Sequence, residues 1–383
     1  MNNLINAKLI YDYSEKGVTV PKEMLPAGKT QDEALDIIKA KGQMVGTNAE
    51  MLSETSSRIC YDSLGNGRDS QGLHVHLKEV NHGSVYEHFN FTAALDCHSD
   101  QDLTNILLSL VNRPGVWMRP DLGKDKVRVT LNLRSILEWD RVKLDTPDGS
   151  TKNAIGIALR VLGNAIAPMV IPAVAHHEID TYGQWRAVRA EPETDEEKWV
   201  SMFISGSRGL SHELVRHGDR SAISQRSTRY VDESAGAWVT HPLVSQYFES
   251  GADVVDEGEC TLKTLKDRIE ITQELARDTY DRMVNKLQPW LISKGVDKFT
   301  ARKQARGAAR GYLGNALQTE LVFSASVAQW KRILGQRLNA AADAEIREMG
   351  AKALIALNGS QYAKDFYGCV IAPSPDGIGV VLA

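Results

Sequence analysis

The sequence lacks the features that would place the protein in a membrane or an oxidising compartment. Its four cysteines are far apart and form no CxxC pair, which excludes a thiolate metal site and is typical of a reducing compartment. The longest apolar run, residues 165–175, is short and contains Pro168 and Pro172, which excludes a membrane-spanning helix. The first residues show no basic segment followed by an apolar one, so we expect no signal peptide and a cytoplasmic protein.

An excess of basic charge is also missing. The 383 residues include 45 Lys and Arg against 49 Asp and Glu, a formal net charge of −4. This balance argues against a general nucleic-acid binder. The apolar content of 42% and the charged content of 25% are ordinary for a globular protein, and the length allows more than one domain.

Against this background, residues 216–230 (RHGDRSAISQRSTRY) hold four arginines among hydroxyl and amide side chains. The stretch is almost free of apolar residues, so we expect it to lie outside the core. Guanidinium groups present a rigid fork of donors that fits phosphate and carboxylate. On a mildly acidic protein, this predicts a site for a small phosphorylated ligand with a polar ring. The alternative is a cluster of salt bridges at an interface.

Hydrophobic periodicity predicts both strands and long helices along the chain. Among these helices, residues 262–291 repeat apolar side chains at helical intervals, and we expect that face to be core. Cys60 lies in an apolar setting, where we expect it only to pack. We expect strands at 7–11, 89–93, 200–204 and 319–327, and helices at 31–40, 48–61, 207–217, 262–291, 299–312, 330–337 and 342–357.

A change in character after residue 97 indicates an inserted subdomain. Residues 98–197 carry their own strand pattern at 127–131 and an amphipathic stretch at 153–171, followed by an exit rich in proline and charge. We therefore predict one domain from residues 1–97 and 198–360, interrupted by an insertion at 98–197. Residues 361–383 form a C-terminal tail, and its part from Pro373 on, which is rich in Gly and Pro, we expect to be peripheral.

Four motifs in a fixed order indicate a family. They are Arg216-His217 with Ser227-Thr228-Arg229-Tyr230; His82, Ser84, Glu87 and His88; Ala309, Arg310 and Leu313; and Arg337, Ala342, Asp343, Glu345, Ile346 and Arg347. In these motifs the chain resembles the flavin-dependent thymidylate synthases, and the resemblance covers most of residues 45–97 and 198–357. A single short motif is weak, but four in order are a specific signal.

The resemblance implies transfer of a methylene group from methylenetetrahydrofolate to C5 of dUMP, with FAD as hydride carrier and NADPH as reductant. It also implies a mixed α/β (α+β) fold with a mixed sheet and long helices, a homotetramer with sites between subunits, and no cysteine nucleophile. Arg337 would be the catalytic guanidinium, which can stabilise negative charge on the pyrimidine ring. The residues implied to hold dUMP are Glu213, Arg216, Gln225, Ser227, Arg229 and Arg310. Those implied to contact the flavin are Ser84, Arg216, His217 and, shifted because the segment has one extra residue, Arg220.

The departures from the family pattern lie mainly among the flavin contacts. Gly218 takes the third position of the R-H-R motif, and Ser326, Ala328 and Arg332 stand where the family has flavin-contacting residues. Within the insertion, a Thr-x-Asn-x-Arg pattern suggests that Asn132 and Arg134 reach the flavin or folate pocket. The alternative is an ordinary strand end with an exposed arginine. The motifs therefore support the predicted nucleotide site better than the predicted flavin site.

Two other functions are compatible with these residues. The same fold could act as a C5-methylase or hydroxymethylase on dCMP or dUMP, with the altered flavin contacts reflecting a different substrate or a step without reduction. The third possible function is that of a non-catalytic, nucleotide-binding relative of the family. In each of them the partner is a small-molecule nucleotide, and we expect neither nucleic acid nor a membrane to bind.

Overall fold

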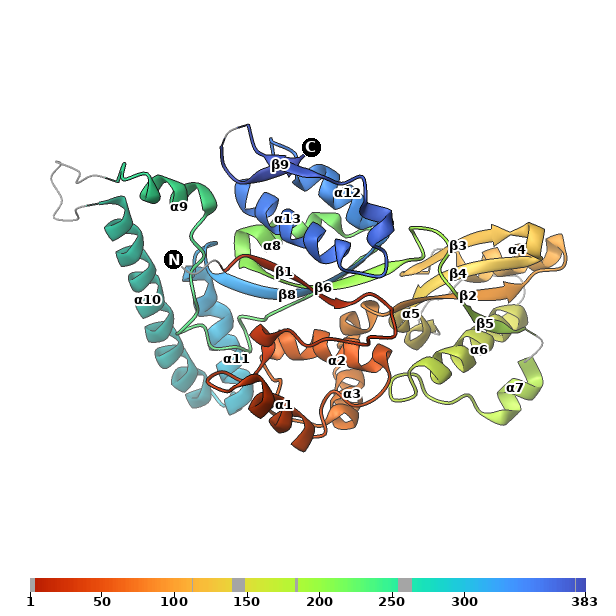
Figure 1. The fold of residues 1–383 in the computed structure, drawn as a ribbon. Helices are drawn as coiled ribbons and strands as arrows, with labels where there is room; N and C mark the ends of the chain where they lie inside the picture. Colours follow the sequence, from red (N-terminus) through yellow and green to blue (C-terminus); the bar gives the residue numbers. More distant parts are fainter. Residues whose placement is uncertain (1–3, 112, 140–148, 183–184, 254–263, 376) are drawn as a thin grey trace.

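The computed structural model describes residues 4–383 with the exception of 112, 140–148, 183–184, 254–263 and 376. Helices combine with two four-stranded antiparallel sheets and a small two-stranded one, which confirms the α/β class. The expectation of one mixed sheet is wrong, because every described strand pair is antiparallel. The two larger sheets lie side by side, one in the middle and one at the right of Figure 1. With their covering helices we call them the core unit and the second unit. No helix in the described part is long and apolar enough to cross a membrane.

The core unit is built on a sheet with the strand order β1-β6-β8-β7. Every residue of β6 is buried, because helices cover the sheet on both faces. The strands predicted at 7–11, 200–204 and 319–327 are confirmed. The bounds are β1 (Asn6–Tyr11), β6 (Trp199–Ser207), β7 (Ser221–Gln225) and β8 (Gln318–Ser326).

Helices from opposite ends of the chain enclose this sheet (Figure 1). One face carries α8, α12 and α13, and α13 contacts β1 and β6. The other face carries α2, which contacts β7 and β8, with α1 and α3 beyond it. The bounds are α1 (Gln31–Ala40), α2 (Asn48–Tyr61), α3 (Ser70–Glu79), α8 (Arg208–Leu214), α12 (Val327–Arg337) and α13 (Ala344–Asn358).

Two of these helices begin at capping boxes that the sequence encodes locally. Thr30 accepts a hydrogen bond from the amide of Glu33, whose carboxylate accepts one from the Thr30 amide, and Thr47 and Glu50 repeat the arrangement. Each box satisfies two amides that the first turn of a helix leaves without partners. The helices predicted at 31–40 and 48–61 are confirmed at both ends.

The second unit is built on a sheet with the order β3-β4-β2-β5. Its first strand, β2, follows directly from the segment around His88, so this sheet contains residues from both sides of position 97. The strand predicted at 127–131 is confirmed. The bounds are β2 (Asn90–Asp96), β3 (Val116–Asp121), β4 (Lys126–Asn132), β5 (Ala187–Ala190), α4 (Asp100–Leu110), α5 (Leu133–Leu137), α6 (Gly149–Ile166) and α7 (His176–Tyr182).

The two units share one hydrophobic core. A single buried cluster runs from Ile10 and Leu52 of the core unit through Phe89 to Val127 and Leu159 of the second unit. The inserted residues are therefore packed against the rest of the chain as one body rather than tethered to it.

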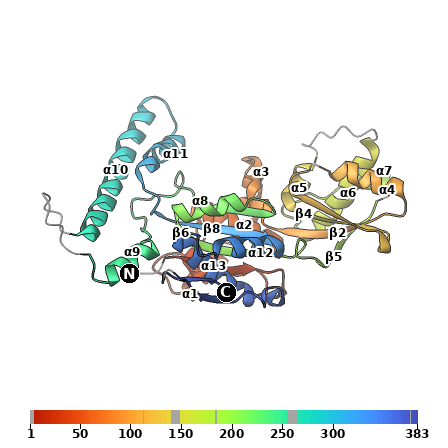
Figure 2. The ribbon, with the colours of Figure 1, turned by 90° about the horizontal axis from the view of Figure 1, so that it is seen from above.

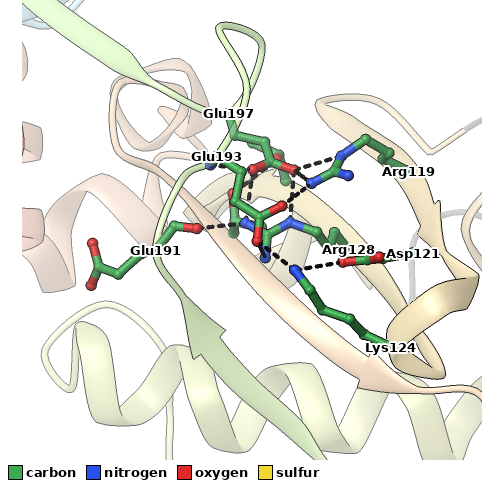
Figure 3. Close-up of polar contacts among 9 residues, drawn as sticks. Arg119, Asp121, Lys124, Arg128, Glu191, Glu193 and Glu197 are labelled. Atoms are coloured by element: carbon green, nitrogen blue, oxygen red, sulfur yellow. Dashed lines mark hydrogen bonds and ion pairs between the residues drawn. The ribbon is translucent and has the colours of Figure 1, made fainter. Parts of the chain in front are cut away.

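Ion pairs reinforce the junction where the chain returns from the second unit to β6 (Figure 3). Arg128 lies 2.8 Å from Glu197, Arg119 lies 2.6 Å from Glu193, and Lys124 lies 3.1 Å from Glu193. Burial alone would raise the pKa of Glu197, but hydrogen bonds from Arg128 and the Glu193 amide, with the nearby arginine charges, lower that pKa to about 2. We call these five residues the junction ion-pair cluster.

A helical hairpin of α10 (Leu265–Ser293) and α11 (Lys298–Ala309) projects from the core unit (Figures 1 and 2). Within this chain α10 buries only Tyr280, and Leu265 is 45% exposed. The prediction that the apolar face of this helix is core is therefore wrong for the single chain. Helical spacing shows which side chains share a face, but it does not show what covers that face.

The C-terminal tail is attached rather than peripheral, which corrects the prediction for it. A hairpin of β9 (Ile371–Pro373) and β10 (Val380–Leu382) contacts α13, and the Leu382 amide donates to the Leu338 carbonyl. The remaining regular elements are α9 (Pro242–Glu249), η1 (Lys22–Met24), η2 (Gly83–Glu87), η3 (Leu122–Lys124), η5 (Val215–His217), η6 (Arg310–Tyr312) and η7 (Ala363–Phe366).

Candidate functional site

The arginine-rich stretch runs from the end of α8 through η5 into an edge strand of the core sheet. That strand, β7, pairs with β8, and its Ala222 and Ser224 are 2% and 3% exposed. The expectation that the stretch lies outside the core is therefore wrong for β7. Strand pairing satisfies the backbone, and a buried serine is tolerated where its hydroxyl finds a partner.

That partner is His88, the last residue of the motif at residues 82–88. Its side chain is fully buried against β7 and β8. Its Nδ1 lies 2.8 Å from the Ser324 hydroxyl and its Nε2 lies 2.9 Å from the Ser224 hydroxyl, while Ser324 also donates to Ser201. Burial lowers the pKa of His88 to about 3, so the ring is neutral and has one donor and one acceptor nitrogen. The pair of bonds fixes η2 against β7 and β8.

Beside this contact a cavity of about 730 Å³ opens between α2, η2, β7 and α11. Four of the predicted site residues line it: Ser84 from η2, and Gln225, Ser227 and Arg229 from the arginine-rich stretch. Two segments that are far apart in sequence thus meet at one cavity. We call it the main cavity.

One wall of the main cavity is held by Arg58, a buried residue that the sequence analysis did not single out. Its Nε lies 2.7 Å from the Glu54 carboxylate, and its other nitrogens donate to the carbonyls of Ser63, Asn66 and Arg68. A guanidinium in the interior has to be satisfied in this way. The loop after α2 is therefore fixed where it lines the cavity.

The opposite end of the main cavity combines aromatic rings with cations. The Tyr61 hydroxyl lies 3.2 Å from Nδ1 of His82, and the Tyr61 and Tyr230 rings are 4.9 Å apart. Lys303 and Arg229 lie over the Tyr230 ring at 5.1 Å and 5.7 Å. Burial lowers the pKa of His82, so this histidine adds no positive charge at neutral pH. Flat apolar walls beside two cations suit a planar ring that carries an anionic group.

Another group of predicted residues gathers away from the main cavity, around Arg337. Its Nε lies 2.8 Å from Nε2 of His217, and its Nη1 lies 2.7 Å from the Glu213 carboxylate. Burial and the Arg337 charge lower the pKa of His217, so the imidazole can accept this hydrogen bond. Arg216 is exposed on the same turn as His217. The guanidinium of Arg337 is thus oriented by two fixed partners.

The four arginines implied to surround the nucleotide do not meet within one chain. Arg229 lines the main cavity, whereas Arg216 and Arg337 belong to the group around His217. Arg310 is exposed at the start of η6. Burial and the charge of Arg310 lower the pKa of Arg208 on α8.

Comparison with known proteins matches the part of the chain that contains these groups. Residues 196–358 match the sequence model of the Thy1 family, described as thymidylate synthase complementing protein. The flavin-dependent thymidylate synthase of Mycobacterium tuberculosis is 35% identical over 159 residues, and that of Mycolicibacterium gilvum is 33% identical over 156. Each match covers 40% of this chain and 56% of the relative, so the chain spans about half the length of these curated relatives.

Residues 196–358, which we call the family domain, are similar in sequence to the flavin-dependent thymidylate synthases. A crystal structure of thymidylate synthase X from Helicobacter pylori with FAD and dUMP was also found. It is 18% identical, covers 44% of this chain and 71% of that chain, and has a TM-score of 0.28.

The family domain includes the arginine-rich stretch and the Arg337 group, but not every predicted residue. Ser84 lies before residue 196, and so does the whole second unit. The main cavity is therefore lined partly by the family domain and partly by the segment around η2.

At the positions where the sequence departs from the family pattern, the structure shows local roles. Ser326 caps α12 by accepting from the Gln329 amide, and Arg332 lies 3.4 Å from Asp219 in the altered R-H-R segment. Arg220 places its guanidinium 5.4 Å from the centroid of the Trp117 ring, which belongs to the second unit. Part of the segment that replaces R-H-R therefore faces the second unit.

Cys60, the cysteine that lines the main cavity, is protonated there. Cys60 is buried, as expected, and burial raises the pKa of its thiol to about 12, so it carries no thiolate at neutral pH. No group of three or more His, Cys, Asp or Glu side chains that could hold a metal ion occurs among the described residues. Asn132 and Arg134, the residues suggested to reach a cofactor, line a smaller cavity between the two units.

Proposed function

We propose that this chain transfers a one-carbon unit from methylenetetrahydrofolate to C5 of a pyrimidine deoxynucleoside monophosphate, converting dUMP to dTMP in the cytoplasm with FAD-mediated reduction by NADPH. The observation that carries the proposal is that Ser84, Gln225, Ser227 and Arg229 line one cavity beside aromatic rings and Lys303. The family of residues 196–358 supports the same chemistry.

In this proposal the main cavity holds the nucleotide. Arg229 and Lys303 bind the phosphate through charge-assisted hydrogen bonds, and the Ser227 hydroxyl adds a further donor. Tyr61 and Tyr230 supply flat faces for the pyrimidine ring. Gln225, whose amide nitrogen donates to Ser211 and Thr319, forms part of the wall.

Arg337, with Arg216, Glu213 and Arg310, would complete the site from another copy of the chain in a homotetramer. A guanidinium held by His217 and Glu213 is already oriented, so it can stabilise negative charge on the pyrimidine without moving. This charge makes C5 nucleophilic toward the methylene carbon. The main cavity of one chain and the Arg337 group of another would then face the same ring.

The residues implied to hold the flavin fit the acidic part of FAD. Arg216 and Arg220 make no ion pair with any described carboxylate, so both guanidiniums are open to a diphosphate, as is the Ser84 hydroxyl of the main cavity. His217 already accepts a hydrogen bond from Arg337, and its role is to orient that guanidinium. When bound, the flavin supplies the hydride that it takes from NADPH.

The test uses the purified full chain with methylenetetrahydrofolate and either dUMP or dCMP, with and without NADPH. We expect dTMP, identified by mass, from dUMP only with NADPH present, and a flavin absorption band in the preparation. A hydroxymethyl product, or turnover of dCMP alone, would replace this reaction by the alternative on the same fold. Colourless protein that binds dUMP without turnover would indicate a non-catalytic relative.

A matched pair of variants assigns the nucleotide to the main cavity. Arg229→Ala removes a cation of the cavity, and we expect its dissociation constant for dUMP to rise about tenfold or more. Arg282→Ala removes the same type of side chain from an exposed ion pair on α10, and we expect no change. Equal affinity in both variants would place the nucleotide elsewhere.

A further inference from the structure

A group of charged side chains lies behind the wall of the main cavity that the arginine-rich stretch forms. Gln225 and Ser227 line the cavity, whereas Arg226 between them does not. Successive side chains of an extended segment point to opposite sides, so the Arg226 guanidinium lies on the side away from the cavity. Its side chain is only 24% exposed, and none of the family motifs includes it.

Three carboxylates surround this guanidinium, and each comes from a different segment. Its nitrogens lie 3.5 Å from Glu233, 3.8 Å from Asp62 at the end of α2, and 3.9 Å from Glu320 on β8. These separations are long for hydrogen bonds, and the Arg226 Nε has no hydrogen-bond partner among the described residues. One positive charge is therefore shared by three carboxylates. We call these four residues the Arg226 cluster.

The Arg226 cluster joins two parts of the cavity wall from behind. Asp62 belongs to the loop after α2, which lines one part of the cavity, and Arg226 is next to Ser227, which lines another. The Ser227 amide also donates to the Cys60 carbonyl near the end of α2. The guanidinium thus helps to set where Ser227 and Arg229 lie relative to that loop.

The charge balance of the Arg226 cluster is negative. The charged groups that face Glu320 are Arg226, Asp62, Glu23 and Glu233. Glu23 also pairs with Lys8, and Arg208 is a second cation near Glu233. Burial raises the pKa of Glu320 to about 7; the Arg226 charge opposes this, and the carboxylates reinforce it. Burial also raises the pKa of Glu233. Glu320 therefore exists in both protonation states near neutral pH.

A phosphate bound at Ser227 and Arg229 would bring further negative charge close to the cluster, because these residues follow Arg226 directly in the chain. Additional negative charge near a buried carboxyl favours its protonated form. The reverse also holds, because linkage is reciprocal: an ionised Glu320 disfavours the phosphate. Nucleotide binding and protonation of Glu320 should therefore support each other.

We propose that Arg226 is a positioning residue of the main cavity, and that the Arg226 cluster takes up a proton at Glu320 when the phosphate of a nucleotide binds. The proton comes from the solvent, and the only bond formed is the O–H bond of the carboxyl group. The proposal rests on the proposed function for one point, the placement of the phosphate at Ser227 and Arg229. Its consequence is that affinity for the nucleotide falls as pH rises through neutrality.

The test is titration calorimetry of the full chain with dUMP in two buffers of different ionisation enthalpy, which counts the protons that binding takes up. The phosphate of dUMP also titrates, so the comparison is with Glu320→Gln, which cannot. For a coupling of about tenfold between phosphate and proton, the unmodified chain should take up about 0.4 proton more per nucleotide at pH 7. Between pH 6 and pH 8 its dissociation constant should rise about fivefold relative to that of the variant.

Two substitutions of Arg226 separate its charge from its position. Arg226→Gln removes the cation that opposes protonation of Glu320, so Glu320 stays protonated at pH 7 and the extra proton uptake should disappear. Arg226→Lys keeps the charge, and the uptake should remain. A compact ammonium cannot span three carboxylates as a guanidinium does, so the dissociation constant for dUMP should still rise severalfold.

Arg306→Gln is the matched control, because Arg306 holds the same segment through a different pair. It donates to the Tyr230 carbonyl and to the Asp232 carboxylate. Despite burial, hydrogen bonds from Ser234 and the Arg306 charge keep the pKa of Asp232 below its usual value, so Asp232 is ionised throughout the test. Proton uptake in Arg306→Gln should equal that of the unmodified chain. Its loss there, or equal uptake by the unmodified chain and Glu320→Gln, would overturn the proposal.

This proposal and the proposed function can fail separately. Binding of dUMP with the expected difference in proton uptake, but without formation of dTMP, would leave the coupling in place and remove the proposed reaction. Formation of dTMP with equal proton uptake by the unmodified chain and Glu320→Gln would do the reverse. Absence of dUMP binding would overturn both.

Discussion

The core unit and the second unit are fixed by different kinds of polar contact. In the core unit the central buried contact is uncharged: a neutral His88 between the hydroxyls of Ser224 and Ser324. At the junction with the second unit the contacts are ionic, with Arg128 and Glu197 both largely buried. Neutral contacts fail when a group gains charge, whereas ion pairs fail when a group loses it. The two regions should therefore respond differently to mutation and to pH.

The largest effect should come from breaking the buried pair of the junction. Arg128→Ala leaves the Glu197 carboxylate buried without its main partner, and we expect a loss of about 3–5 kcal/mol in the free energy of unfolding. Chemical denaturation at pH 7 measures it. The acid dependence should also change, because the low pKa of Glu197 stabilises the fold above pH 4.5 and that contribution is lost as pH falls toward 2.

The double variant Arg128→Met with Glu197→Leu is the matched control. It removes both charges and keeps the volume, so we expect it to recover most of the stability that the single variant loses. If the double variant is as unstable as Arg128→Ala, the contact is stabilised by packing rather than by charge. The contrast between ionic contacts at the junction and neutral contacts in the core unit would then not hold.

A smaller loss should follow from removing the neutral contact of the core unit. His88→Phe keeps an aromatic ring but leaves the Ser224 hydroxyl without its partner, and we expect a loss of about 2–3 kcal/mol. In the unmodified chain the pKa of His88 is about 3 in the folded state and 6.5 in the unfolded state. Protons therefore favour unfolding as pH falls from 6.5 to 3, by up to about 1.4 kcal/mol per unit.

The pH profile separates this loss from a packing defect. His88→Phe should lose part of the slope between pH 6.5 and 3, whereas His98→Gln, at an exposed position, should keep all of it. Denaturation midpoints at several pH values within this range measure the slope. An unchanged slope in His88→Phe would mean that His88 does not titrate between these limits.

Glu320 on β8 should show the opposite pH dependence within the same unit. Burial raises the pKa of Glu320 to about 7, only partly offset by the Arg226 charge, so the folded state holds a proton that the unfolded state releases above pH 4.5. The stability from this proton is lost as pH rises from 4.5 through 7. We expect the free energy of unfolding of Glu320→Gln to exceed that of the unmodified chain by roughly 2 kcal/mol at pH 8 and to match it at pH 5. Glu270→Gln, exposed on α10, should show no difference at either pH.

An element of the fold could be predicted from the sequence where the residues that stabilise it lie within the element itself. The helices α1 and α2 have their caps and their apolar spacing within one segment, so both ends were predicted correctly. The strand β7 has little apolar alternation; it is paired with β8, and its buried Ser224 is satisfied by His88 from far along the chain. Nothing within residues 216–230 shows that partner.

The same limit applies to the candidate site. Resemblance to a family placed Ser84 and Arg229 in one site, and in the structure both line the main cavity. It did not indicate Arg58 or Lys303, because their places in the cavity come from the packing of α2 and α11. Nor could the sequence show that Arg220 would lie over Trp117, since no family motif includes the second unit.

The smallest effect on stability should come from Arg134, where the question is whether the second unit takes part in function. Its side chain is 38% exposed and pairs with Glu87 and Glu138, so Arg134→Ala should cost about 0.5–1 kcal/mol. If this arginine helps to hold a cofactor in the smaller cavity between the two units, flavin content and turnover should nevertheless fall severalfold. Arg160→Ala removes a partly exposed arginine on α6 that pairs with Glu178 and does not line this cavity, and it should leave both unchanged. Equal flavin content and turnover in the two variants would mean that Arg134 only joins the two units.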